Sequence, residues 1–347
     1  MTPSARYVMV LLATTGLILG LILGLNLLLG ERALGGPKVT RLASEWQQQS
    51  KGVTYAPPIT AARRFKALRL ADRMPGISAM AFGSSTAWGI TADAMPEGYG
   101  FYNFGVTGNS LANIIGEIEY FLVQYPDRLK LLVVPMEWAI GSVYDRSPPP
   151  TMNLAPNAVL AEAEQSVVSM SRKIQDALSY PKVANLLLAL RSLFQAPEPL
   201  AGARSLFFGV AGDTYQCADG SLARDFDVVN RGQCAGFRYD GSWSFGGEKR
   251  LTVARAAALS RAAAAHSSKF SHALCITGGE PNPEYLRRLM KVAQALSQSG
   301  AKALFILPPL VPGMEREMAA DEMNRSCLAR TKQVLQTWSQ EVNVTII

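Results

Sequence analysis

One uncharged, apolar run near the N-terminus constrains this chain more than any other feature. From Tyr7 to Gly30 the sequence has no charged residue and consists mostly of Leu, Ile, Val and Gly. As a helix rising about 1.5 Å per residue, this run extends roughly 36 Å, which exceeds a hydrocarbon core of about 30 Å. The apolar region of a cleaved signal peptide usually has only about 7–15 residues. The sequence therefore predicts an uncleaved transmembrane anchor over residues 1–30, with a signal peptide as the alternative.

The charges beside this run leave the orientation of the anchor open. Arg6 and the terminal amine precede it, whereas Arg32, Lys38 and Arg41 follow it. The distribution of positive charge therefore does not mark one side as cytoplasmic. Because a short N-terminal tail followed by a long exported domain is the simpler arrangement, we expect a single-pass protein of the inner (cytoplasmic) membrane. Its soluble domain is then periplasmic or extracellular.

Three glycines within the run share one face of the expected helix. Gly16, Gly20 and Gly24 are spaced four residues apart, and a row of glycines lets another helix backbone approach closely. The alternative is that the glycines face lipid, which is common in membrane helices. The sequence thus leaves two expectations, a partner helix in the membrane or contact with lipid alone.

Beyond the anchor, the hydrophobic pattern alternates between strands and helices. Residues 31–74 are expected to be a juxtamembrane linker and helix, and residues 75–347 an α/β domain. Alternation of this kind predicts three layers around a mainly parallel sheet of five strands, as in flavodoxin-like folds. Residues 196–248 break the pattern with Gly, Asp and aromatic residues, which indicates an insertion. The expected strands are 77–82, 102–104, 129–135, 303–307 and 342–347, and the expected helices 109–124, 155–194, 249–265, 283–298 and 319–340.

Composition excludes several classes of protein. A hydrophobic share of 48% and a charged share of 18% exclude wholesale disorder. Four cysteines without a C-x-x-C pair, beside two histidines, argue against a zinc finger. The sequence has no P-loop, dinucleotide fingerprint or metal-binding helix, so we expect no metal and no cofactor. The formal charge of +7 fits an anionic membrane or envelope polymer, and without a nucleic-acid-binding motif we expect no nucleic acid partner.

Cysteines and basic residues each leave two interpretations. Cys217 and Cys234 lie 17 residues apart inside the expected insertion, and an oxidising compartment would allow them to form a disulfide. Cys275 and Cys327 are either free thiols or a second bridge. A basic cluster on a helix past the linker is expected to form a solvated face or to contact anionic headgroups; it comprises Arg63, Arg64, Lys66 and Arg69.

Two loops of small residues follow the first two expected strands. The first strand runs directly into Gly83-Ser84-Ser85-Thr86, and the second into Gly105-Val106-Thr107-Gly108-Asn109. Parallel strands deliver such loops to the same edge of the sheet, where α/β folds bind ligands. Glycine permits the tight turn, and the backbone amides that follow it can face an oxyanion. Trp88 is expected near Ser85, as a pocket wall or as ordinary packing.

In these loops the sequence resembles the SGNH/GDSL hydrolase superfamily. Gly83-Ser84-Ser85 matches the block that supplies the nucleophile of that family, and Asn103–Gly108 matches its second block. The resemblance implies that Ser85 is the catalytic nucleophile and that the amides of Ser85 and Gly108 form the oxyanion hole. Ser84 and Asn109 would lie beside the pocket. The resemblance covers roughly residues 75–140 and 280–347.

The third block departs from the family pattern. Where the family has Gly-x-Asn-Asp, this chain has Pro135-Met136-Glu137-Trp138. An acidic residue followed by Trp resembles membrane-anchored relatives that act in cell-envelope O-acylation beside a multi-spanning acyltransferase. Glu137 and Trp138 are therefore expected pocket residues. For Glu137 the alternatives are a helix cap or a salt bridge, and for Trp138 ordinary packing.

The last block also departs from the pattern. The family's Asp-x-x-His, which supplies the base, would follow the fifth strand, and the sequence ends inside that strand at Ile347. His266 and His272 precede the fourth strand, and neither has an Asp three residues upstream. We expect them at the surface or at helix ends, and we expect no complete triad. Since a serine hydroxyl is a poor nucleophile without a base, activity stays open.

Two functions are consistent with these observations. The first is an exported, membrane-anchored SGNH-like enzyme that transfers or hydrolyses acyl (acetyl) esters of a cell-envelope polysaccharide. The second is a catalytically inactive scaffold or binding subunit with the same fold. In both, the expected partners are the membrane and a multi-spanning, acyltransferase-like protein. The enzyme would also bind a polysaccharide or acyl-ester substrate.

Overall fold

Two compact units make up the chain in the computed structural model. The first unit comprises residues 1–69, 155–239 and 244–247, and the second comprises residues 70–154, 240–243 and 248–347. The first contains most of a mixed β-sheet and the second a parallel β-sheet. Apart from a few single positions, the structure describes residues 3–33, 37–55, 62–135, 151–159, 214–226, 234–245, 283–306, 322–341 and 344–346.

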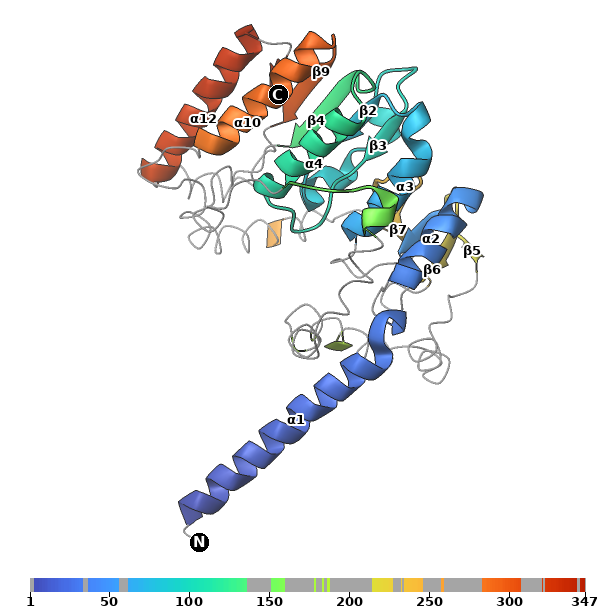
Figure 1. Cartoon of the computed structure of the whole chain (residues 1–347), viewed down its shortest axis with the longest axis vertical. Coiled ribbons are helices and arrows are strands. Elements are labelled where there is room, and N and C mark those ends of the chain that lie inside the picture. Colours follow the sequence, from blue (N-terminus) through green and yellow to red (C-terminus); the bar gives the residue numbers. More distant parts are fainter. Residues whose placement is uncertain are drawn as a thin grey trace. The chain divides into compact units, whose positions relative to one another are not determined.

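The first unit begins with a long helix, α1 (Pro3–Ala33) (Figure 1). Its segment Ser4–Asn26 has a mean hydropathy of 2.5 over its most apolar window, none of which is buried in the structure. Leu17, for example, is 75% exposed, an arrangement that water disfavours and lipid does not. A signal sequence near the N-terminus also meets the length and hydropathy that a membrane span requires, so α1 is long and apolar enough to be a membrane anchor or a signal sequence.

Residues 37–73, expected to be a linker and one helix, form two helices and a strand. The strand, β1 (Val53–Tyr55), pairs in parallel with β6 (Leu222–Asp225) and antiparallel with β7 (Ala235–Phe237). Strands from the expected insertion therefore flank β1 in one mixed sheet. A three-residue strand is too short to show a period of two in the sequence, which explains why β1 was missed. The remaining elements are α2 (Pro37–Ser50), α3 (Ala62–Arg73), β5 (Tyr215–Gln216) and β8 (Trp243–Phe245), and the sheet order is β5-β6-β1-β7-β8.

Two members of the basic cluster on α3 are fully buried, so the expected solvated face is wrong for them. The Lys66 Nζ lies 4.7 Å from the centroid of the Phe237 ring, and the Arg69 guanidinium carbon lies 5.4 Å from that of Tyr239. The electron-rich face of an aromatic ring attracts a cation, which offsets part of the free energy lost when the charge leaves water. Sequence patterning on α3 alone could not reveal these partners, because they come from a distant part of the chain.

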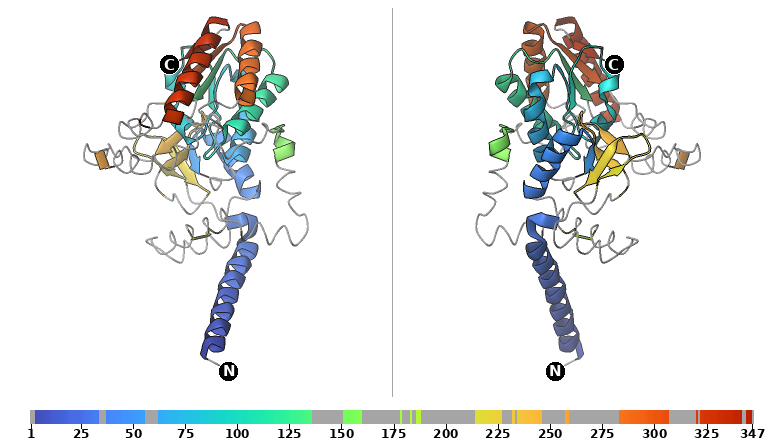
Figure 2. Two further views of the ribbon diagram at one scale, coloured as in Figure 1. Left: turned by 90° about the vertical axis from the view of Figure 1, so that its left-hand side faces the viewer. Right: turned by 90° about the vertical axis from the view of Figure 1, so that its right-hand side faces the viewer.

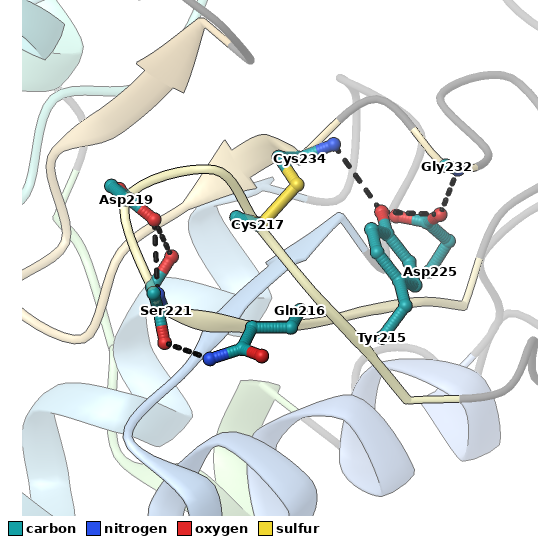
Figure 3. The surroundings of a disulfide bond; sticks show 9 residues. Tyr215, Gln216, Cys217, Asp219, Ser221, Asp225, Gly232 and Cys234 are labelled. Atoms are coloured by element: carbon teal, nitrogen blue, oxygen red, sulfur yellow. Dashed lines mark hydrogen bonds between the residues drawn. A yellow bond between two sulfur atoms is a disulfide. The ribbon is translucent and has the colours of Figure 1, made fainter.

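A disulfide joins Cys217 and Cys234, with the sulfurs 2.08 Å apart (Figure 3). Beside it, the Tyr215 hydroxyl donates to Asp225 Oδ2 over 2.8 Å and accepts from the Cys234 N–H over 3.3 Å. The Gly232 N–H donates to the same carboxylate oxygen over 2.7 Å. Burial, and then the contact with Asp225, raise the pKa of Tyr215 to about 12. The phenol therefore stays protonated and donates its hydrogen at neutral pH.

The structure does not describe the side chains of the other two cysteines, Cys275 and Cys327. Cys275 lies outside the described residues, and so does the side chain of Cys327. The question of a second bridge therefore stays as the sequence left it.

We predict that reduction of the Cys217–Cys234 disulfide lowers the free energy of unfolding by about 3 kcal/mol, because closing a loop of this length restricts the unfolded chain. The full chain in detergent is unfolded by urea with and without dithiothreitol, and circular dichroism follows the transition. The control is the double variant Cys217→Ser, Cys234→Ser. Reductant is expected to lower the midpoint of the wild type only. An equal shift in both proteins would contradict the prediction.

The second unit is built on a sheet with strand order β10-β9-β4-β2-β3, in which every neighbouring pair is parallel. The predicted α/β class with parallel pairing is thus confirmed. In β2, Ala79, Met80 and Ala81 are fully buried, as expected for a central strand of a parallel sheet. The strands are β2 (Ala79–Ala81), β3 (Phe101–Asn103), β4 (Leu131–Pro135), β9 (Lys302–Ile306) and β10 (Val344–Ile346), and their ends lie within two residues of the expected ones.

Three helices connect these strands: α4 (Leu111–Gln124), α10 (Pro283–Gln298) and α12 (Glu322–Glu341). The connections β3–α4–β4, β4–α10–β9 and β9–α12–β10 all step in the same direction across the sheet. Because parallel crossovers are right-handed, these helices belong to one face of the sheet. An ion pair between Arg288 and Glu119 joins α10 to α4, with 2.8 Å between Nε and Oε1. Figures 1 and 2 show α10 and α12 side by side.

The start of α4 differs from the sequence prediction. The expected helix begins at Asn109, but α4 begins at Leu111 with Ser110 as its N-cap, whose Oγ accepts a hydrogen bond from the Asn113 N–H over 3.3 Å. Asn109 is thereby left for a different contact. The expected helices at 155–194 and 249–265 lie mostly outside the described residues.

Candidate functional site

The strand order places the Ser85 loop where the sheet topology changes direction. After β2 the chain forms β3 on one side of it and then crosses over to form β4 on the other side. In open α/β sheets, ligands bind outside the carboxyl ends of the strands at such a switch point. Gly83 follows β2 at this position. A Cβ on Gly83 would lie 3.5 Å from Cδ of Pro135, the last residue of β4, so the two strand ends are adjacent.

The two serines after β2 have different roles. Ser84 is buried and caps the short 3-10 helix η3 (Ser85–Gly89), because its Oγ accepts from the Thr86 N–H over 3.4 Å. Ser85 is the first residue of η3 and is exposed. The structure therefore uses Ser84 to shape the turn and presents the Ser85 side chain to solvent.

Asn103 ties the loop after β3 to η3. Its side-chain amide nitrogen donates to the carbonyl oxygens of Ala87 over 2.6 Å and Ile90 over 2.9 Å. Its side-chain oxygen accepts from the Gly105 N–H over 2.8 Å. Glycine is required at position 105, because a Cβ there would lie 2.9 Å from the Ala87 Cβ. The loop after β3 and η3 therefore pack so closely that position 105 has no room for a side chain.

The loop after β3 carries the second expected oxyanion donor, Gly108. This residue is exposed and has a φ of +64°, which favours glycine. The Val106 N–H donates to the Gly83 carbonyl over 2.9 Å and holds the two loops together. Within the part of the chain that the structure describes, no hydrogen bond engages the backbone N–H of Ser85 or Gly108. Uncommitted amides of this kind are what an oxyanion hole needs.

A buried carboxylate next to this loop was missed by the sequence analysis. The Asn109 side-chain nitrogen donates to Glu117 Oε2 over 2.9 Å, and Glu117 is fully buried. Burial of a carboxylate requires such partners, because leaving water disfavours the charge. Nothing in the sequence separates Glu117 from the partly exposed Glu119 on the same helix. Asn109 therefore anchors the end of the Gly108 loop to α4.

A turn from a distant part of the chain also joins the site. Asp240 accepts hydrogen bonds from the Ala92 N–H at Oδ2, over 2.9 Å, and from the Asn103 N–H at its carbonyl, over 2.7 Å. Its Oδ1 accepts from the N–H and the hydroxyl of Ser242, over 2.9 and 2.6 Å. The dipeptide Asp240-Gly241 signals a turn in the sequence, but it does not reveal where the turn binds.

The same turn brings one tryptophan against another. The rings of Trp243 and Trp88 stack with 4.5 Å between centroids and 15° between planes. The Trp88 Nε1–H donates to the Gly105 carbonyl over 3.0 Å. Trp88 is buried and Trp243 is partly exposed. Trp88 therefore has a packing role beside the Ser85 loop, and its partly exposed neighbour Trp243 was not foreseen.

The remaining sequence candidates lie outside the described residues. These are Glu137, Trp138, His266 and His272. In the described ranges, no group of three or more His, Cys, Asp or Glu side chains is arranged to hold a metal ion.

Comparison with known proteins adds no assignment. A scan against protein-family models finds no match, and neither does a search of curated proteins or of solved structures. The site is therefore interpreted from its own geometry.

We predict that Asn103→Asp lowers the free energy of unfolding by about 3 kcal/mol. The carboxylate still accepts from Gly105, but it cannot donate to the Ala87 and Ile90 carbonyls, so two hydrogen bonds are lost and the new negative charge faces two carbonyl oxygens. Urea unfolding of both proteins measures the difference. The matched control is Asn113→Asp, at a partly exposed position in the first turn of α4, where a change below about 0.5 kcal/mol is expected. Equal effects of the two substitutions would refute the role assigned to Asn103.

Proposed function

We propose that this protein is a membrane-anchored, exported acyl-transfer protein of the SGNH/GDSL-hydrolase type. It transfers acyl groups such as acetyl to or from a cell-envelope polysaccharide, or hydrolyses their esters. The observation that carries the proposal is the exposure of Ser85 as the first residue of η3, at the switch point of a parallel sheet. The strand order matches the flavodoxin-like arrangement, which is consistent with a three-layer fold of this superfamily.

In the proposed reaction the Ser85 hydroxyl oxygen attacks the carbonyl carbon of an acyl ester. Negative charge then develops on the carbonyl oxygen, and the backbone amides of Ser85 and Gly108 donate hydrogen bonds to it. The intermediate expels the alcohol of the donor ester, which takes up a proton, and leaves an acyl group on Ser85. A sugar hydroxyl or water next attacks this acyl-enzyme and regenerates the serine. We assign no residue to the base that such a serine requires.

We predict that a fluorophosphonate probe labels the wild-type protein at Ser85 and that Ser85→Ala abolishes the labelling. The reaction needs the same nucleophile and oxyanion donors as acyl transfer, so it tests the site without knowledge of the substrate. Mass spectrometry of the labelled peptide locates the adduct. The matched control is Ser299→Ala, at another exposed serine, which should keep full labelling. An unlabelled wild type, or labelling that survives Ser85→Ala, would leave the scaffold or binding subunit as the better proposal.

We also propose that α1 is an uncleaved anchor, on whose glycine face a multi-spanning partner packs. No described atom lies within 4 Å of a Cβ placed on Gly16, Gly20 or Gly24, so this face of α1 has room for a second helix backbone. The partner is acyltransferase-like in this proposal, since an exported acyl-transfer protein needs acyl groups delivered across the membrane.

We predict that the protein purified from membranes retains its N-terminal segment and stays in the membrane pellet after alkaline carbonate extraction. An apolar helix of this length holds the chain in the bilayer, whereas signal peptidase would release the domain. Intact-mass spectrometry measures the N-terminus. A mass that lacks the first 25–35 residues or so, or extraction into the soluble fraction, would show that α1 is a signal sequence.

A further inference from the structure

The stacked pair Trp88–Trp243 is held more rigidly than ordinary packing requires. On one side, Trp88 is fixed by its hydrogen bond to the Gly105 carbonyl. On the other side, the turn that carries Trp243 is fixed by the four hydrogen bonds that Asp240 accepts. A partly exposed indole is thereby held in one orientation, and a preorganised side chain loses little conformational entropy when a ligand binds to it.

Helix geometry places this pair close to Ser85. Trp88 is three residues after Ser85 in the same 3-10 helix. Residues at i and i+3 of a 3-10 helix lie on the same side, one turn or about 6 Å apart along the axis. The Trp88–Trp243 stack therefore lies on the side of η3 from which the Ser85 side chain projects.

The residues near the partly exposed Trp243 favour a sugar over an acyl chain. An acyl chain binds in an enclosed apolar channel, whereas Ser85 and Thr86, which precede Trp88 in η3, are both exposed and carry hydroxyl groups. Asp240, in the turn just before Trp243, is partly exposed and adds a carboxylate. A flat indole face bordered by hydroxyl groups and a carboxylate suits a pyranose ring. The C–H face of the ring packs on the indole, and its hydroxyls reach the polar border.

We propose that Trp243 is a carbohydrate-stacking residue that binds a pyranose ring of the acyl donor or acceptor beside Ser85. This inference rests on the proposed function for the role of Ser85, but the binding that it predicts is independent of catalysis. The ligand of this site is then a carbohydrate. Trp243 determines the specificity for it, and the Asp240 turn holds Trp243 in place.

The test measures binding of cellohexaose to the full chain in detergent by saturation-transfer NMR. Cellohexaose is the probe because all ring substituents of β-glucopyranose are equatorial, so both faces of each ring present C–H groups. We expect the wild-type protein to bind it, Trp243→Phe to bind about threefold more weakly, and Trp243→Ala about tenfold more weakly. The matched control is Trp46→Ala. Trp46 is a partly exposed tryptophan of the first unit, paired with Phe226 at 6.2 Å between centroids, and its loss should not change the affinity.

The outcomes separate the two proposals. If the wild type does not bind cellohexaose, if both Trp243 variants keep wild-type affinity, or if Trp46→Ala loses as much as Trp243→Ala, the carbohydrate site is overturned. Fluorophosphonate labelling of Ser85 is measured in the same variants. Normal labelling without sugar binding would leave the acyl-transfer proposal intact, and Trp243-dependent sugar binding without labelling would support a non-catalytic carbohydrate-binding subunit. Normal labelling of Trp243→Phe also shows that this variant is folded.

Discussion

The hydrogen bonds of the Asn103 side chain hold the candidate site together. This amide donates twice to carbonyls of the η3 region and accepts once from the loop that leads to Gly108. A carboxylate can only accept and a lysine can only donate, so an amide is needed to do both. Buried hydrogen bonds are stronger than exposed ones. Together with the backbone hydrogen bond between Val106 and Gly83, Asn103 therefore fixes the spatial relation between Ser85 and Gly108, although it takes no part in the proposed chemistry.

Around this centre, side chains from three separate parts of the chain converge on one edge of the parallel sheet. Ser84 shapes the turn after β2, Asn109 connects the second loop to the buried Glu117, and Asp240 accepts from the backbone N–H groups of Ala92 and Asn103. Each contact uses a polar group that would be unfavourable in the interior without its partner. The site is therefore rigid where it holds Ser85 and exposed where a substrate would enter.

The first unit shows the same dependence on distant partners. Lys66 and Arg69 are buried on α3, where their charged groups lie against the aromatic rings of Phe237 and Tyr239. The strand β1 is short and gains a sheet only by pairing with strands that lie far along the chain. In both cases the local sequence suggested a solvated or irregular segment, since local patterns carry no information about partners of this kind.

Local hydrophobic patterns were enough to predict the apolar helix α1, the α/β class, the parallel pairing and the positions of β2, β3, β4, β9, β10 and α10. Local patterns were enough here because an apolar run long enough to span a membrane, or an apolar strand, consists of consecutive residues. The predicted meeting of the loops after β2 and β3 at one edge of the sheet is also present in the structure. Only the tertiary structure decided that Ser84 is buried while Ser85 is exposed, that Glu117 is enclosed, and that Trp243 stacks beside η3. The exposure of each of these side chains depends on its neighbours in the folded chain. Those neighbours come from distant parts of the sequence, so local patterns do not predict them.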